Sequence, residues 1–152
     1  MLRLPGHTPD YVGYQVGTAV FTGDSTFSPD VGRARCDFPG GSATALFHSM
    51  RTPLALPAHF RLYSGHDYPP GERGVPLPYT TVAEQNERNK RVKRGVEEVQ
   101  FVQFVQWGSE RDTRLGDPRL LHWALQFNIR GGSLPKAMEG ALRLLRVPAT
   151  MM

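Results

Sequence analysis

The sequence predicts an α/β fold, and three observations support this. Two β-rich segments lie side by side near the N-terminus, a third lies near residue 60, and segments with helical periodicity follow them. A chain of 152 residues fits one domain, which would bury roughly two-thirds of the surface exposed when unfolded. We therefore expect one soluble domain over residues 1–152, without internal repeats.

The first two strands are predicted at Tyr11 to Val16 and Ala19 to Thr22, separated only by Gly17-Thr18. A two-residue gap that contains glycine is typical of a hairpin turn. The second strand ends at Gly23-Asp24. Residues 25–41 are rich in Gly, Pro and Asp without a hydrophobic period, which predicts a long loop of the kind that is usually functional.

The first helix is predicted after this loop. Ser42 is a suitable N-cap, and Pro53 interrupts the helical pattern, so this helix should be short. Its apolar positions are Ala43, Leu46, Phe47 and Met50. A strand from Phe60 to Ser64 follows, and it leads into a Pro- and Gly-rich loop that continues to Pro78.

A second, charged helix is predicted through about Val92, because Thr81 and Glu84 form a capping-box pattern. Its basic run is interpreted as a solvated helix face, since no aromatic side chains are interleaved with it for stacking on bases. We therefore expect no nucleic-acid partner. The run consists of Arg88, Lys90, Arg91, Lys93 and Arg94.

Two more helices are predicted, one from about Val96 to Trp107 and one that begins at Pro118 and ends before Gly131-Gly132. The apolar side expected for the first comprises Val99, Val102 and Val105. Its aromatic side chains are expected in the core rather than at a cofactor, and these are Phe101, Phe104 and Trp107. The inward face expected for the last helix comprises Leu120, Leu121, Ala124 and Leu125.

Strong nitrogen and oxygen donors lie at or near the ends of the predicted strands. His7 lies in Pro5-Gly6-His7-Thr8-Pro9, Asp24 closes one strand, and His66 follows another. Because strand ends are rigid, a side chain placed there can keep coordination geometry. Singly, each residue would more often be a turn or cap residue, so their joint occurrence carries the prediction. Two imidazoles and a carboxylate suit zinc or non-haem iron.

The remaining histidines and the cysteine are assigned no chemistry. His48, His59 and His122 are interpreted as surface or satisfied core histidines. Cys36 is the single cysteine, so an internal disulfide is excluded, and a reducing compartment is consistent with this. Because no base partner is evident for its thiol, Cys36 is interpreted as a loop residue.

The donor motifs resemble the later motifs of the metallo-β-lactamase superfamily, in the branch that contains glyoxalase II and the persulfide dioxygenases. Pro5-Gly6-His7-Thr8-Pro9, Thr22-Gly23-Asp24 and Gly65-His66-Asp67-Tyr68 carry this resemblance. The stretch Ala34-Arg35-Cys36-Asp37-Phe38-Pro39-Gly40-Gly41 resembles the persulfide dioxygenase loop, and Gln126-Phe127-Asn128-Ile129-Arg130 resembles the ending of that group.

The superfamily's first metal motif, HxHxDH, has no counterpart in this sequence. The resemblance therefore implies that residues 1–152 form the C-terminal part of an αββα sandwich, a single partial domain that lacks the half bearing this motif. A sheet edge and one core face are then expected to be uncovered. We expect poor solubility when this chain is expressed alone, or pairing with a partner, including a homodimer.

The resemblance implies that His7 and Asp24 are metal ligands. In a persulfide dioxygenase, the leading interpretation, one Fe(II) would be held by His7, Asp24 and a histidine absent from this chain, and His66 would not bind it. In a thioester hydrolase of the hydroxyacylglutathione hydrolase type, Asp24 would bridge two Zn(II) ions and His66 would bind the second. A third alternative is an inactive metal-binding or interaction module.

The resemblance also implies a small-molecule substrate, a glutathione conjugate, contacted by Arg35 and Tyr68. The net charge of +4 and the fit of guanidinium to carboxylate agree with this. A salt bridge between Arg35 and Asp37 is an equal alternative. No apolar run could span a bilayer and no signal peptide is evident, so no membrane contact and a cytoplasmic location are expected, with a mitochondrial full-length parent as the alternative.

Overall fold

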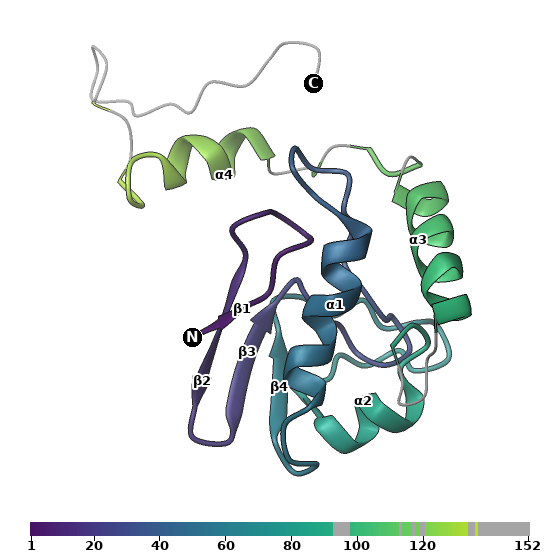
Figure 1. The fold of residues 1–152 in the computed structure, drawn as a ribbon. Helices are drawn as coiled ribbons and strands as arrows, with labels where there is room; N and C mark the ends of the chain where they lie inside the picture. The colour runs from purple at the N-terminus through teal and green to yellow at the C-terminus, as the bar shows by residue number, and fades with distance from the viewer. Residues whose placement is uncertain (93–97, 113, 117, 119–120, 134–135, 137–152) are drawn as a thin grey trace. The chain divides into compact units, whose positions relative to one another are not determined.

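The computed structural model describes residues 1–92, 98–112, 114–116, 118, 121–133 and 136. The chain divides into two compact units, Met1–Arg114 and Leu115–Met152. Helices and a mixed sheet confirm the predicted α/β class (Figure 1). No helix in the described part of the chain is long and apolar enough to cross a membrane.

The first unit is built on a five-stranded sheet with the order β1-β2-β3-β4-β5. Its strands are β1 (Leu2–Arg3), β2 (Val12–Val16), β3 (Ala19–Gly23), β4 (Arg61–Ser64) and β5 (Thr80–Thr81). The predicted hairpin is confirmed, because Val16 pairs with Ala19 across the turn between β2 and β3. β3 and β4 are parallel, so both strands end at the same edge of the sheet.

Helix α1 (Ala43–Leu54) connects β3 to β4 and covers one face of the sheet (Figure 1). The predicted cap is confirmed, because the Ser42 hydroxyl oxygen accepts the Ala45 N–H at 3.2 Å. Pro53 lies inside the last turn, and the helix ends one residue after it. The proline therefore limits the helix as the sequence indicates.

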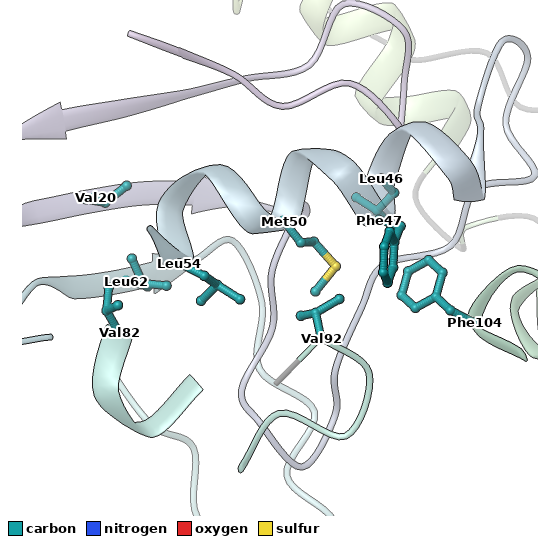
Figure 2. Close-up of a cluster of buried hydrophobic side chains, with 9 residues drawn as sticks. All are labelled: Val20, Leu46, Phe47, Met50, Leu54, Leu62, Val82, Val92 and Phe104. Carbon is teal, nitrogen blue, oxygen red and sulfur yellow. The ribbon is translucent and has the colours of Figure 1, made fainter. Parts of the chain in front are cut away.

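The core of the first unit lies between the sheet and the helices. Figure 2 shows the α1 side chains between those of the sheet and those of residues 92 and 104. The buried cluster comprises Val20, Leu46, Phe47, Met50, Leu54, Leu62, Val82, Val92 and Phe104. Burial of this apolar surface fixes α1 against the parallel strand pair.

Helix α2 (Val82–Arg88) begins with the predicted capping box. Its predicted end at Val92 is wrong, because the Asn89 side-chain oxygen accepts the backbone N–H groups of Arg91 and Val92 and forms a turn instead. The interpretation of the basic run as a helix face is therefore also wrong beyond Arg88. Lys93 and Arg94 lie outside the described residues.

Helix α3 (Glu98–Asp112) continues beyond the predicted end at Trp107. The predicted start at Val96 and the side chains of Val99 and Trp107 lie outside what the structure describes. Phe104 is buried as predicted, and Phe101 and Val105 pack against the core. The prediction that Val102 faces inward is wrong, because Val102 is 60% exposed. The inward positions 101, 104, 105 and 108 follow the helical period, and 102 falls outside it.

Helix α4 (Leu121–Asn128) belongs to the second unit and ends before Gly131-Gly132, as predicted. Both glycines have positive φ, which stops the helix. The helix starts after Pro118, whose carbonyl accepts the Leu121 N–H. The predicted inward face is wrong for Ala124 and Leu125, which are exposed, because no other described helix or strand of this unit covers α4. Leu121 is half-buried, and Leu120 lies outside the described residues.

The sheet face opposite α1 carries a row of apolar side chains. Phe21 stacks on Tyr63 with ring centroids 5.2 Å apart, and Tyr63 lies 5.6 Å from Tyr79. Tyr14, which pairs with Phe21 across the hairpin, is 57% exposed, and Phe21 is 46% exposed. These aromatic side chains are neighbours and form a row, whereas exposed apolar residues on an ordinary surface are usually isolated from one another.

Candidate metal centre

Asp24 and His66 meet because they follow parallel neighbouring strands. Gly23 at the end of β3 pairs with Ser64 at the end of β4, and the Gly65 N–H donates to the Gly23 carbonyl at 2.9 Å. The two chain segments therefore leave the sheet together. His66 Nε2 lies 3.7 Å from Asp24 Oδ2.

His7 approaches the same carboxylate from the loop between β1 and β2. Its Nε2 atom also lies 3.7 Å from Asp24 Oδ2. The structure thus brings together the three predicted donors as two pairs that share one oxygen. No three His, Cys, Asp or Glu side chains within the described ranges form a complete metal-binding group by themselves.

The His7 ring is fixed on both sides. Its Nδ1 lies 2.7 Å from the Arg35 carbonyl oxygen, and because a carbonyl only accepts, Nδ1 carries the proton. Tyr11 and Phe38 hold the ring edge-on, at centroid distances of 5.5 Å and 5.1 Å. In the neutral imidazole the Nε2 lone pair is therefore available, and it lies close to the Asp24 carboxylate.

Asp24 is held by its backbone and has an unsatisfied side-chain oxygen. Its N–H donates to the Tyr11 hydroxyl at 2.7 Å, and burial raises the pKa of Tyr11 above its ordinary value. Within the described part of the chain, the buried Oδ1 atom has no hydrogen-bond partner. A Cβ at Gly65 would lie 2.7 Å from that atom, so only glycine leaves this space.

These atoms fit a cation. A neutral imidazole nitrogen near a carboxylate oxygen brings two acceptors together, and a buried carboxylate oxygen without a partner is costly. A positive ion between such atoms would relieve both costs. Each histidine shares Asp24, but no third donor completes either pair among the described residues.

The loop after His66 is anchored by an ion-pair network that the sequence did not reveal. Arg73 donates to both carboxylate oxygens of Asp67 at 2.6 Å and 2.8 Å, and to Asp30 at 2.7 Å. The Leu77 N–H donates to Asp67 at 2.7 Å. The Arg73 guanidinium is the main cause of a lowered Asp67 pKa of about 2. Nothing in the spacing of these residues marked the network.

We expect this network to make the fold sensitive to acid. Because the folded-state pKa of Asp67 is depressed from 3.8 to about 2, the carboxylate stabilises the fold above about pH 4 and loses this effect as the pH falls toward 2. The contribution is about 2 kcal/mol at neutral pH. Urea unfolding at pH 7 and pH 3 should show a smaller pH dependence for Asp67→Asn than for the unsubstituted protein.

The control for this measurement is Glu72→Gln, which removes an exposed carboxylate from the same loop. It should leave the pH dependence of the unfolding free energy unchanged. An Asp67→Asn protein as acid-sensitive as its parent would contradict the role given to the Arg73–Asp67 pair.

The two predicted substrate contacts lie on loops beside the donors. The Arg35 guanidinium makes two hydrogen bonds to Asp37, one of 2.6 Å, and lies 5.0 Å from the Phe38 ring centroid, so the alternative salt bridge is present. Tyr68 is 59% exposed, and its ring centroid is 5.8 Å from that of His66. His48 and His59 are exposed, as expected of surface histidines, and His122 is half-buried.

Known proteins are similar to this chain in sequence and in fold. No protein-family profile matches the chain. "Glyoxylase B2" of Dictyostelium discoideum is 44% identical over 149 residues, which is 97% of this chain and 50% of that protein. "Beta-lactamase hydrolase-like protein" of Agrobacterium fabrum is 45% identical over 148 residues, 97% of this chain and 33% of that protein.

A solved structure is also similar to this chain. The crystal structure of ETHE1 from Myxococcus xanthus matches with a TM-score of 0.67 and 33% identity, over 87% of this chain and 53% of that chain. The chain thus spans about half of these proteins or less. Sequence and structure together place the chain in the metallo-β-lactamase superfamily, among glyoxalase II-like relatives.

Proposed function

We propose that this chain supplies part of the metal-binding active site of an enzyme that acts on a glutathione-linked sulfur substrate, most like a persulfide dioxygenase. One observation carries the metal-binding part of this proposal: Nε2 of His7 and Nε2 of His66 both lie 3.7 Å from Asp24 Oδ2. Membership in a family of metallo-β-lactamase-fold hydrolases supports metal dependence.

In the dioxygenase interpretation, His7 and Asp24 hold one Fe(II) together with a histidine from outside this chain. His7 suits this role because its ring is 13% exposed and hydrogen-bonded through Nδ1. When bound in a two-histidine, one-carboxylate arrangement, iron supplies redox chemistry at open coordination positions. His66, with 58% of its side chain exposed, is left beside the site without a ligand role. Similarity to ETHE1, a persulfide dioxygenase, favours this interpretation.

A thioester hydrolase is the second candidate. The equal distances of both Nε2 atoms from Asp24 Oδ2 favour it, because each of two metal ions that share this carboxylate would then have one histidine of this chain available. Two Zn(II) ions would then be held by this chain's His7, Asp24 and His66 with ligands from elsewhere. An inactive metal-binding or interaction module is the third candidate, since no three donor side chains of the described residues form a complete metal-binding group.

Arg35 and Tyr68 are proposed to contact the glutathione part of the substrate. Both lie on loops next to the donor residues, and the Arg35 carbonyl accepts a hydrogen bond from His7. A substrate carboxylate would compete with Asp37 for the Arg35 guanidinium, whose planar fork suits either partner.

Elemental analysis tests the three candidates. The samples are this chain, the chain joined to any natural upstream region that carries HxHxDH, and the His7→Ala variant of each. About one iron per extended protein, lost in the variant, supports the dioxygenase. Two zinc ions support the hydrolase, and no metal in any sample would leave only the interaction module.

A further inference from the structure

A single peptide group lies between His7 and the end of α3. The carbonyl of Arg35 accepts the His7 Nδ1–H at 2.7 Å, and the N–H of Cys36 donates to Asp112 Oδ2 at 2.8 Å. This carbonyl and this N–H belong to the same planar amide. A rotation that breaks one hydrogen bond therefore disturbs the other.

Asp112 is a rigid anchor for that amide. It is the last residue of α3 and is 3% exposed, and its Oδ2 also accepts both terminal nitrogens of Arg33 at 3.2 Å. Arg33 is fully buried, donates to the Ala34 carbonyl and lies over the Phe104 ring at 5.2 Å. The carboxylate therefore cannot move without disrupting a buried ion pair.

We propose that Asp112 is a positioning residue for His7. Through the Arg35–Cys36 peptide it fixes the orientation of the imidazole and holds the proton on Nδ1, so that Nε2 is presented toward Asp24. A charged acceptor on the amide N–H polarises the amide and makes its carbonyl a stronger acceptor. The value of this arrangement for metal binding rests on the function proposed above, because Nε2 is the atom that would bind the metal.

The first test uses the unsubstituted protein without metal. Nitrogen-15 NMR of the imidazole side chains distinguishes the two neutral tautomers of His7, and His7→Ala assigns its signals. We expect the Nδ1–H tautomer to predominate. An Nε2–H tautomer, or a rapidly exchanging mixture of the two tautomers, would overturn the proposal regardless of the tautomers found in the variants.

The second test compares Asp112→Ala with Asp112→Asn. Both remove the charge opposite Arg33, so both should lower the unfolding midpoint. Only alanine removes the acceptor for the Cys36 N–H, because the asparagine amide oxygen can accept it. We expect a tautomer mixture in the alanine variant and the wild-type tautomer in the asparagine variant. Asp37→Asn, which removes another carboxylate of this loop, should leave the tautomer unchanged.

Calorimetric titration with Zn(II) gives an independent result. The affinity of Asp112→Ala for Zn(II) should be roughly 10–100-fold weaker than that of the unsubstituted protein. This range is typical when a group that orients a metal ligand without touching the metal is lost. A folded Asp112→Ala protein with the wild-type tautomer would refute the positioning role even if its zinc affinity is weaker. If the alanine variant does not fold, an Nε2–H tautomer or a tautomer mixture in the unsubstituted protein still overturns the proposal. Absence of zinc binding in the protein joined to an upstream region that carries HxHxDH would instead count against the proposed function.

Discussion

Asp24→Asn is expected to abolish metal binding, with an affinity loss of more than about 100-fold, beyond the range for an outer-shell partner. The reason is that both histidines face the same Asp24 oxygen, so one substitution affects both pairs. Asparagine keeps the size of the side chain but removes the charge, and neutral amide oxygens are poor ligands for zinc or iron. Metal titration followed by elemental analysis measures the loss.

His66→Ala is the informative comparison for Asp24→Asn. In a dinuclear site it should remove one metal, and in a mononuclear site it should remove none, since His7 and Asp24 remain. The unfolding midpoint of metal-free Asp24→Asn should stay close to that of the metal-free parent, which separates ligand loss from misfolding. Full metal content in Asp24→Asn would show that Asp24 is not a ligand.

Gly108→Ala is expected to destabilise the first unit by about 3 kcal/mol, within the range for overpacking or for breaking a buried ion pair. A Cβ at Gly108 would lie 1.7 Å from a terminal nitrogen of Arg33 and 2.5 Å from its Cζ. The long side chain of Arg33 has no room to retreat, because it is fully buried and paired with Asp112. In an unobstructed helix the same change would stabilise the protein by roughly 1 kcal/mol. The sign of the change in unfolding free energy is therefore enough to show whether the new methyl group clashes with Arg33.

Urea unfolding of Gly108→Ala alongside Gly71→Ala measures this effect. Gly71 has no heavy atom within 4 Å of its virtual Cβ, so its substitution should change the unfolding free energy by less than about 0.5 kcal/mol. If Gly108→Ala is as stable as Gly71→Ala, the guanidinium is not confined where the structure places it.

Local signals predicted much of the fold. The turn at Gly17-Thr18, the Ser42 cap and the Thr81–Glu84 capping box each depend on residues that are neighbours in sequence, and all three are confirmed. The errors have physical causes. Asn89 ends α2 with a side-chain hydrogen bond that competes with the helix, and α3 turns Val102 outward because contacts with α1 set its inward face.

The candidate site was only partly predictable. His7, Asp24 and His66 lie in short motifs, so sequence could single them out, and the structure brings them together. Tyr11 and Asp112 were missed because their contacts cross long stretches of chain and no local pattern marks them. The hydroxyl of Tyr11 matters only once Gly23 allows it to approach Asp24.

The parallel pairing of β3 with β4 has a consequence for the order of folding. The β2–β3 hairpin joins residues that are close in sequence, whereas the β3–β4 ladder requires closure of the whole crossover that contains α1. Contacts between distant segments form slowly because their entropic cost precedes their gain. Asp24 and His66 become neighbours only when this ladder exists. A newly synthesised chain therefore carries all three donors before it has a site.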